Sequence, residues 1–239
     1  MNIISKIKIN GISADALKWI ALITMLIDHT GASILEKIPQ YTTVSRVFYL
    51  DLLLRLIGRI AFPIYCFLLV EGFYKTRSRK KYACNLFVFA IISEIPFELS
   101  FMGGLDIGFH NVYWTLLLGM LLMMTLEVVK VRRPDKYNLL ALLSLAVFAG
   151  TAQLVYTDYA AIGVMLIFIL YQTRDDRKKQ SLLGAVAMCY EITAPISFLL
   201  TYRYNGQRKQ RKSGLTKYAF YAFYPIHLII LYWVKLLIL

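Results

Sequence analysis

The first long apolar stretch of the chain contains the ionisable side chains of Lys18, Asp28 and His29. Ionisable groups are costly to place in apolar segments, and those that occur there usually serve a function. In a helix, Lys18 and His29, which are 11 residues apart, project from nearly the same face with a rise of about 16 Å between them. Imidazole exchanges protons near neutral pH, so His29 is a candidate general base on a face lined by polar groups.

Two arginines in the next apolar stretch offer a partner for Asp28. Arg55 and Arg59 are four residues apart, so in a helix they share one face. Arg59 is expected at a depth similar to that of Asp28, which predicts an Asp28–Arg59 ion pair that neutralises both groups. The alternative stays open that this pair joins two helices and takes no part in chemistry.

Later apolar stretches contribute further polar residues. Glu71, Glu94, Glu98 and His227 extend the predicted polar core along the chain, although His227 is more readily explained as a residue that holds helices together. The three cysteines are odd in number and lack a CxxC spacing, so neither a disulfide framework nor a metal site is predicted.

The composition indicates the elements that must position these residues. Hydrophobic residues make up 59% of the chain, charged residues 17%, and the mean hydropathy is +0.58. Soluble domains carry about 45–50% apolar and about 25% charged residues, so a water-soluble fold is excluded. Apolar runs of about 20 residues recur, which is the length of a membrane-spanning helix. They do not alternate apolar and polar residues as β-barrel strands do. The predicted fold is an all-α, polytopic integral membrane helix bundle.

About eight membrane segments are expected in a single transmembrane domain that covers residues 1–239. No linker between them is long enough to form a second domain. The expected segments are 15–35, 51–73, 82–100, 111–130, 138–156, 159–172, 181–201 and 218–238.

The distribution of basic residues predicts the topology. The net charge is +13, and Lys and Arg cluster in short loops between apolar segments. Such loops stay in the cytoplasm, which places the N-terminus there and the protein in the cytoplasmic (inner) membrane. Because no basic stripe is interleaved with exposed aromatic residues, nucleic acid is not an expected partner. The lipid bilayer is the expected partner.

One basic loop does not fit a simple alternation of crossings. The loop between residues 203 and 217 is rich in Lys and Arg, yet alternation places it outside. Glu191 and Pro195 interrupt the preceding segment, so we expect residues 181–201 to form a re-entrant hairpin that returns the chain to the cytoplasm. Broken helices of this kind are tolerated where they line a cavity.

An ordered set of motifs resembles the TraX-like family of membrane proteins across nearly the whole chain. Each motif is weak alone, and the order makes the set specific. The chain differs from the family after Tyr204-Asn205-Gly206, because the family often has a Gly shortly afterwards and this chain continues with Gln207-Arg208-Lys209. The motifs are Leu17-Lys18-Trp19-Ile20-Ala21, Met25-Leu26-Ile27-Asp28-His29, Leu56-Ile57-Gly58-Arg59-Ile60-Ala61-Phe62-Pro63, Glu71-Gly72-Phe73, Ile95-Pro96-Phe97, Asn111 with Thr115 and Gly119, Thr157-Asp158-Tyr159, Tyr204-Asn205-Gly206, and Tyr224-Pro225-Ile226-His227-Leu228.

The resemblance implies an acetyltransferase. TraX-like proteins are associated with N-terminal acetylation of pilin, and they look distantly similar to the acyltransferase-3 group, whose first helix has a basic residue and a histidine at the spacing of Lys18 and His29. It implies that acetyl-coenzyme A (acetyl-CoA) from the cytoplasm is the acyl donor. The residues expected to carry the reaction are His29 as general base, Arg59 as oxyanion stabiliser and Asp28 as the group that fixes Arg59.

Clustered cations are expected to hold the phosphates of acetyl-CoA. The candidates for this role are Lys18, Lys75, Arg77, Arg208 and Lys209. The lower-ranked residues of the polar core or the acceptor site are Arg55, Glu71, Asn111, Asp158, Tyr224 and His227.

The sequence does not name the acceptor: the resemblance implies the pilin N-terminal amine, and a cell-envelope glycan hydroxyl at the outer face is expected to be equally reachable. A transporter for a small solute, coupled or not to protons, is the alternative from another class, because intramembrane Asp, Glu and His suit it as well. Binding of acetyl-CoA distinguishes the two readings.

Overall fold

The computed structural model describes residues 11–39, 41–42, 45–105, 108–207 and 214–239. All secondary-structure elements assigned within these residues are helices. This agrees with the predicted all-α fold. The α-helices are α1 (Ala14–Ser33), α2 (Arg46–Gly58), α3 (Ala61–Lys75), α4 (Arg79–Phe101), α5 (Val112–Arg132), α6 (Tyr137–Leu154), α7 (Ala160–Gln172), α8 (Arg177–Ala187), α9 (Ile196–Tyr202) and α10 (Gly214–Ile238). Two short 3-10 helices are η2 (Leu35–Lys37) and η3 (Pro134–Lys136).

Polar side chains define where several helices begin. The hydroxyl of Ser13 accepts a hydrogen bond from the backbone N–H of Ala16 at the start of α1, at 3.2 Å. The side chains of Ser78 and Asn111 accept in the same way at the starts of α4 and α5. Such caps satisfy N–H groups that have no partner inside the helix. The N-terminal ends of the helices that carry Lys18, Lys81 and Tyr113 are therefore fixed locally.

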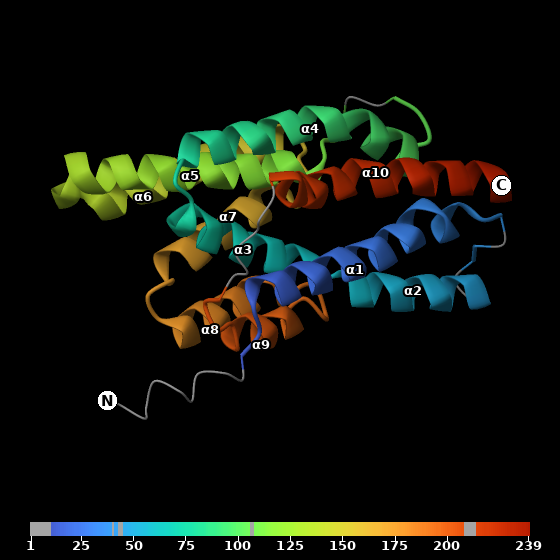
Figure 1. Cartoon of the computed structure of the whole chain (residues 1–239), viewed down its shortest axis with the longest axis horizontal. Coiled ribbons are helices and arrows are strands. Elements are labelled where there is room, and N and C mark those ends of the chain that lie inside the picture. Colours follow the sequence, from blue (N-terminus) through green and yellow to red (C-terminus); the bar gives the residue numbers. More distant parts are fainter. Residues whose placement is uncertain (1–10, 40, 43–44, 106–107, 208–213) are drawn as a thin grey trace.

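The helices run roughly along one long axis (Figure 1). Helices α4, α5, α6 and α10 lie along one side of the bundle, with α1 and α2 on the other and α8 and α9 beside the beginning of α1. Helix α1 packs against α2 and α3, and α10 packs against α4. The buried core follows these contacts and includes Leu17, Phe67, Phe73, Met120 and Leu166.

In the part of the chain that the structure describes, five helical stretches are long and apolar enough to cross a membrane. Their outward-facing side chains are apolar as well: on α6, Leu139, Leu142 and Val147 are each at least 59% exposed. A row of exposed aliphatic side chains is stable in contact with lipid tails but not with water. The chain is therefore a multi-pass membrane protein. The five stretches are Arg46–Lys75, Arg79–Phe101, Val112–Arg132, Pro134–Leu154 and Tyr218–Ile238.

The structure does not confirm the predicted count of about eight membrane segments. Helix α1 is absent from the five because Lys18, Asp28 and His29 lower its hydropathy. The apolar helix Ala160–Gln172 is shorter than a full crossing. The predicted segment 51–73 lies within Arg46–Lys75, which is one of the five stretches although α2 ends and α3 begins at Arg59 and Ile60 inside it. A count of crossings from apolar length alone therefore exceeds the number of full-length apolar helices.

The stretch predicted as a re-entrant hairpin consists of two short helices that pack against each other. In this hairpin, residues 177–204, α8 and α9 are joined by turns at residues 188–195. Both of its ends contact the last turns of α3, since Arg177 lies 3.1 Å from Glu71 and the Tyr204 hydroxyl accepts from Lys75 at 2.8 Å. The turn between the helices reaches the opposite end of α3, where Glu191 contacts Arg59 at 3.1 Å. The hairpin thus begins and ends at the same end of the bundle, beside the last turns of α3. Insertion of this hairpin into a membrane stays a prediction.

Candidate functional site

Two histidines from the first and last helices form a hydrogen-bonded pair. Nδ1 of His29 on α1 lies 2.7 Å from Nε2 of His227 on α10, and the two ring planes are inclined by 17°. The other nitrogen of His227, Nδ1, lies 2.7 Å from the carbonyl oxygen of Phe223. The structure thus joins the candidate base to a residue that ranked lower in the sequence analysis.

Aromatic rings surround this histidine pair. The ring of Tyr224 stands edge-on to both histidines, with centroids 5.8 Å from His29 and 5.6 Å from His227. Phe101 is edge-on to His29 at 5.1 Å. The hydroxyl of Tyr224 is buried and has no hydrogen-bond partner in the described part of the chain. An unpaired buried hydroxyl is unusual in a folded protein and is available to a bound molecule.

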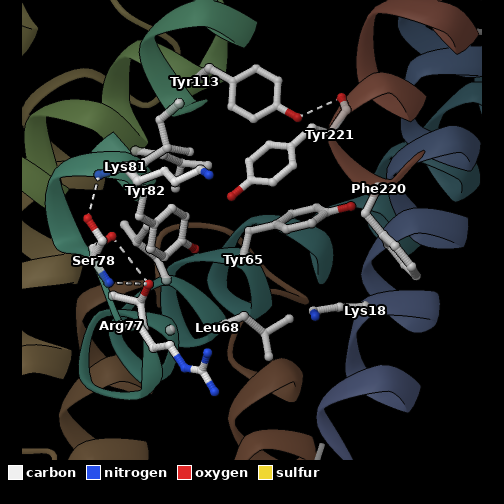
Figure 2. A pocket seen from close by; sticks show the side chains of 15 residues that line it. Lys18, Tyr65, Leu68, Arg77, Ser78, Lys81, Tyr82, Tyr113, Phe220 and Tyr221 are labelled. Carbon is white, nitrogen blue, oxygen red and sulfur yellow. Dashed lines mark hydrogen bonds between the residues drawn. The ribbon is translucent and has the colours of Figure 1, made fainter. Parts of the chain in front are cut away.

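A cavity of about 390 Å³ opens between α1, α3, α4, α5 and α10 (Figure 2). Five aromatic residues line it: Tyr65, Tyr82, Tyr113, Phe220 and Tyr221. At the end away from Arg77, the hydroxyl of Tyr113 donates to the carbonyl of Tyr221 at 2.9 Å. Tyr113 also packs against Tyr224, with 5.2 Å between ring centroids. The cavity therefore ends two aromatic rings away from the histidine pair.

Three cations and no carboxylate occur among the described residues that line the cavity. Lys18 comes from α1 and lies 5.6 Å from the centroid of the Phe220 ring, whereas Arg77 and Lys81 come from the link between α3 and α4 and the first turn of α4. Arg77 and Lys81 are exposed, and neither forms an ion pair within the described residues. Figure 2 shows the three side chains around the tyrosines. This lining suits an anionic ligand with an aromatic or apolar part.

Two of the predicted acetyl-CoA-binding residues therefore line the cavity, Lys18 and Arg77. Lys81, which was not among the predicted residues, lines it as well. Lys75 does not line it, because its Nζ lies 3.0 Å from Glu71 and donates to Tyr204 at 2.8 Å. Arg208 and Lys209 lie outside the described residues. A basic loop alone cannot separate Lys75 from Lys81, since the difference depends on which face of the helix end each residue occupies.

The prediction of an Asp28–Arg59 ion pair is wrong, because Asp28 pairs with a different arginine. Asp28 pairs with Arg55, whose Nη1 lies 2.6 Å from Oδ2, and Arg59 pairs with Glu191 at 3.1 Å. The prediction assumed one unbroken helix through both arginines, whereas α2 ends at Gly58 and α3 begins at Ala61. The hairpin turn brings Glu191 to Arg59, a long-range contact that helix spacing cannot reveal. Arg55 contacts Glu36 as well, at 3.5 Å.

Glu71 belongs to a separate network at the end of α3. Its two carboxylate oxygens lie 3.0 Å from Lys75 and 3.1 Å from Arg177. The guanidinium of Arg177 also lies over the rings of Phe67 and Tyr204. This network fastens the two ends of the hairpin to α3, and it does not reach the cavity.

Asn111 and Asp158 hold helix ends together beside the candidate site. The Asn111 amide donates to the carbonyl of Ala90 at 2.8 Å and to the carboxylate of Glu94, which also contacts His110 at 2.6 Å. The carbonyl of Asp158 accepts from the hydroxyl of Thr115. Neither residue lines the cavity, so no contact in the described residues supports their predicted role in the acceptor site. In the described part of the chain, no group of three or more His, Cys, Asp or Glu side chains could hold a metal ion.

The fold and the site define a multi-pass α-helical membrane protein with a cation-lined cavity and, two aromatic rings beyond its end, a partly buried histidine pair. Residues 13–235 match the family model described as TraX protein, and the chain belongs to this family. A curated relative, the probable fimbrial assembly protein FimC, serogroup H1, of Dichelobacter nodosus, is 30% identical over an alignment of 250 residues. The alignment covers 92% of this chain and 94% of the relative. No solved structure matches the chain.

Proposed function

We propose that this protein is a membrane acetyltransferase that uses acetyl-CoA and His29 to acetylate an amine or hydroxyl acceptor. The observation that carries the proposal is the cavity, which has three cations and no carboxylate among its described lining residues and ends two aromatic rings from the His29–His227 pair. An acyl donor held there has its anionic part at the cations and its reactive end toward an imidazole.

The lining fits the chemical parts of acetyl-CoA. Lys18, Arg77 and Lys81 supply the cations that phosphates require. Tyrosines offer flat apolar faces to the pantetheine arm and hydroxyls to its amides. The volume of about 390 Å³ falls within the range of about 300–1,000 Å³ that small-molecule sites occupy. Because part of the ligand remains in the open mouth of the cavity, the nucleotide need not be enclosed.

The chemistry proposed for His29 is general base catalysis. Its imidazole takes the proton from the attacking amine or hydroxyl as the acceptor bonds to the thioester carbonyl carbon. When the carbon–sulfur bond breaks, the departing thiolate receives that proton from the imidazolium. Such proton transfer typically contributes about 10²–10⁴ in rate. Arg59 is the proposed oxyanion stabiliser, with Glu191 in the positioning role that the sequence analysis gave to Asp28.

The relative's name supports a role connected with pili, so the pilin N-terminal amine is the first acceptor to test. A cell-envelope glycan hydroxyl is the second, because the same base can activate it. The basic loops support a location in the cytoplasmic membrane with the N-terminus in the cytoplasm. In the proposed topology, the mouth of the cavity beside Arg77 and Lys81 faces the side where acetyl-CoA is available.

The test is acetyl-CoA binding to the detergent-purified protein, measured by calorimetry for the wild type, Lys18→Ala and His29→Ala. We expect binding by the wild type, weaker binding by Lys18→Ala, and nearly unchanged binding by His29→Ala with acetyl transfer to a pilin peptide reduced about 10²- to 10⁴-fold. A folded wild-type protein that binds no acetyl-CoA would overturn the proposal. Uptake of a solute by vesicles in the absence of acetyl transfer would support a transporter instead.

A further inference from the structure

We propose that His227 is a positioning residue that holds His29 in the tautomer whose Nε2 carries a free lone pair. The inference deepens the proposed function, on which its catalytic part rests. It starts from two contacts of one ring: His227 Nε2 lies 2.7 Å from His29 Nδ1, and His227 Nδ1 lies 2.7 Å from the carbonyl oxygen of Phe223.

The carbonyl determines which nitrogen of His227 bears hydrogen. A carbonyl oxygen can only accept a hydrogen bond, so Nδ1 of His227 must be the donor. In a neutral imidazole the other nitrogen is then an acceptor, and Nε2 of His227 presents its lone pair to His29. Nδ1 of His29 must therefore carry the hydrogen. It follows that Nε2 of His29 is unprotonated and able to take a proton from the acceptor.

The surroundings favour a neutral His227. Its side chain is 4% exposed, and neither histidine of the pair forms an ion pair with a carboxylate in the described part of the chain. A doubly protonated His227, the one arrangement that would reverse the hydrogen bond, therefore has no compensating partner.

Packing keeps both rings in this orientation. The ring of Phe223 stacks on His227 with centroids 4.9 Å apart and planes inclined by 17°. Tyr224 and Phe101 stand edge-on to His29. Phe223 lies one helical turn before His227 and also supplies the accepting carbonyl. Residues of α10 therefore hold the His227 ring in the orientation that sets the hydrogen bond to His29.

The test reads the tautomers directly by ¹⁵N NMR of the detergent-purified full chain, labelled at histidine and carrying a tag without histidine. The chain has three histidines, and His110→Gln and His227→Phe assign the signals. We expect His29 to show a protonated Nδ1 and an unprotonated Nε2, and to lose this preference in His227→Phe, which keeps an aromatic ring but removes the acceptor. A wild-type His29 with hydrogen on Nε2 would overturn the inference.

Kinetics test the catalytic part. We expect His227→Phe to lower kcat for acetyl transfer at least about tenfold with an unchanged KM for acetyl-CoA, since the variant alters the base and leaves the cavity intact. His110→Gln, which lies outside the pair, is the control and should retain kcat. Full kcat in His227→Phe would overturn the role. If the protein transferred no acetyl group at all, the proposed function would fail, whereas the tautomers would still decide whether His227 sets the state of His29.

Discussion

The ring of Tyr113 stands edge-on to the ring of Tyr224, with 5.2 Å between their centroids and 77° between their planes. Tyr113 lines the cavity, and Tyr224 contacts both members of the histidine pair. These two rings therefore stand between the proposed donor site and the proposed base. Their hydroxyls differ, because that of Tyr113 donates to a carbonyl and that of Tyr224 is buried without a partner in the described residues.

This difference predicts opposite effects for two identical substitutions. Tyr224→Phe should leave the free energy of unfolding unchanged or raise it by up to about 1 kcal/mol, because an unpaired buried hydroxyl costs stability. Tyr113→Phe should lower it by about 1 kcal/mol, because the hydrogen bond to the Tyr221 carbonyl is lost. Unfolding in mixed detergent micelles measures both.

Activity measurements show whether the unpaired hydroxyl of Tyr224 takes part in the reaction. We expect Tyr224→Phe to lower kcat for acetyl transfer at least about tenfold, because its hydroxyl is available to the reacting thioester. Tyr113→Phe should retain more activity than Tyr224→Phe despite its lower stability. A Tyr224→Phe variant with full activity would show that its hydroxyl takes no part in the reaction.

The two neighbouring lysines at the start of α4 provide a second matched pair. Lys81 lines the cavity and Lys80 does not, although both are exposed. Lys81→Ala should weaken acetyl-CoA binding about three- to tenfold, since an exposed charge contact is worth up to about 1 kcal/mol and is screened by salt. Lys80→Ala should leave the Kd nearly unchanged. Calorimetry at two ionic strengths checks the effect, and equal losses in the two variants would argue for a diffuse basic surface in place of the cavity.

The sequence was sufficient to predict the features that depend on local pattern. Apolar run length predicted an all-α membrane protein, and ordered motifs predicted the TraX family, which the family match confirms. The 11-residue spacing of Lys18 and His29 indicated one helix face. In the structure, Lys18 lines the cavity and His29 lies beyond its end.

Contacts between distant segments could not be predicted in this way. His227 lies 198 residues after His29, and no spacing rule relates them. The partner of Arg59 is Glu191, which the hairpin carries to the junction of α2 and α3. Helix periodicity predicts neighbours within one helix, whereas these pairs depend on how separate helices cross, which only the assembled bundle specifies.

The shape of the hairpin predicts where its two ends are accessible. Asp175 precedes α8 and Arg203 follows α9, and both are exposed. Because Arg177 and Tyr204 both contact the last turns of α3, Asp175→Cys and Arg203→Cys should react with an impermeant maleimide from the same side of the membrane. Cells and inside-out vesicles give the two measurements, in a background with Cys84→Ser and Cys189→Ser. Reaction from opposite sides would mean that residues 181–201 cross the membrane once.

The contact between α1 and α2 depends on a glycine. The last residue of α2, Gly58, lies so close to Asp28 that a Cβ at this position would overlap the Asp28 side chain. In α6, by contrast, a Cβ at Gly150 would meet no atom within 4 Å. Alanine at the two positions therefore tests crowding and helix propensity separately.

Gly58→Ala should lower the free energy of unfolding by about 1–3 kcal/mol, the usual cost of forcing atoms into a packed contact. The displacement should also weaken the Asp28–Arg55 ion pair, which now has 2.6 Å between Nη1 and Oδ2. Gly150→Ala should raise the free energy of unfolding by about 0.5–1 kcal/mol, because alanine favours helix over glycine. Unfolding in mixed micelles compares the two variants. If both were stabilising, α2 could not pack against Asp28 as described, and the Asp28–Arg55 pair would have to form at a greater separation of α1 and α2.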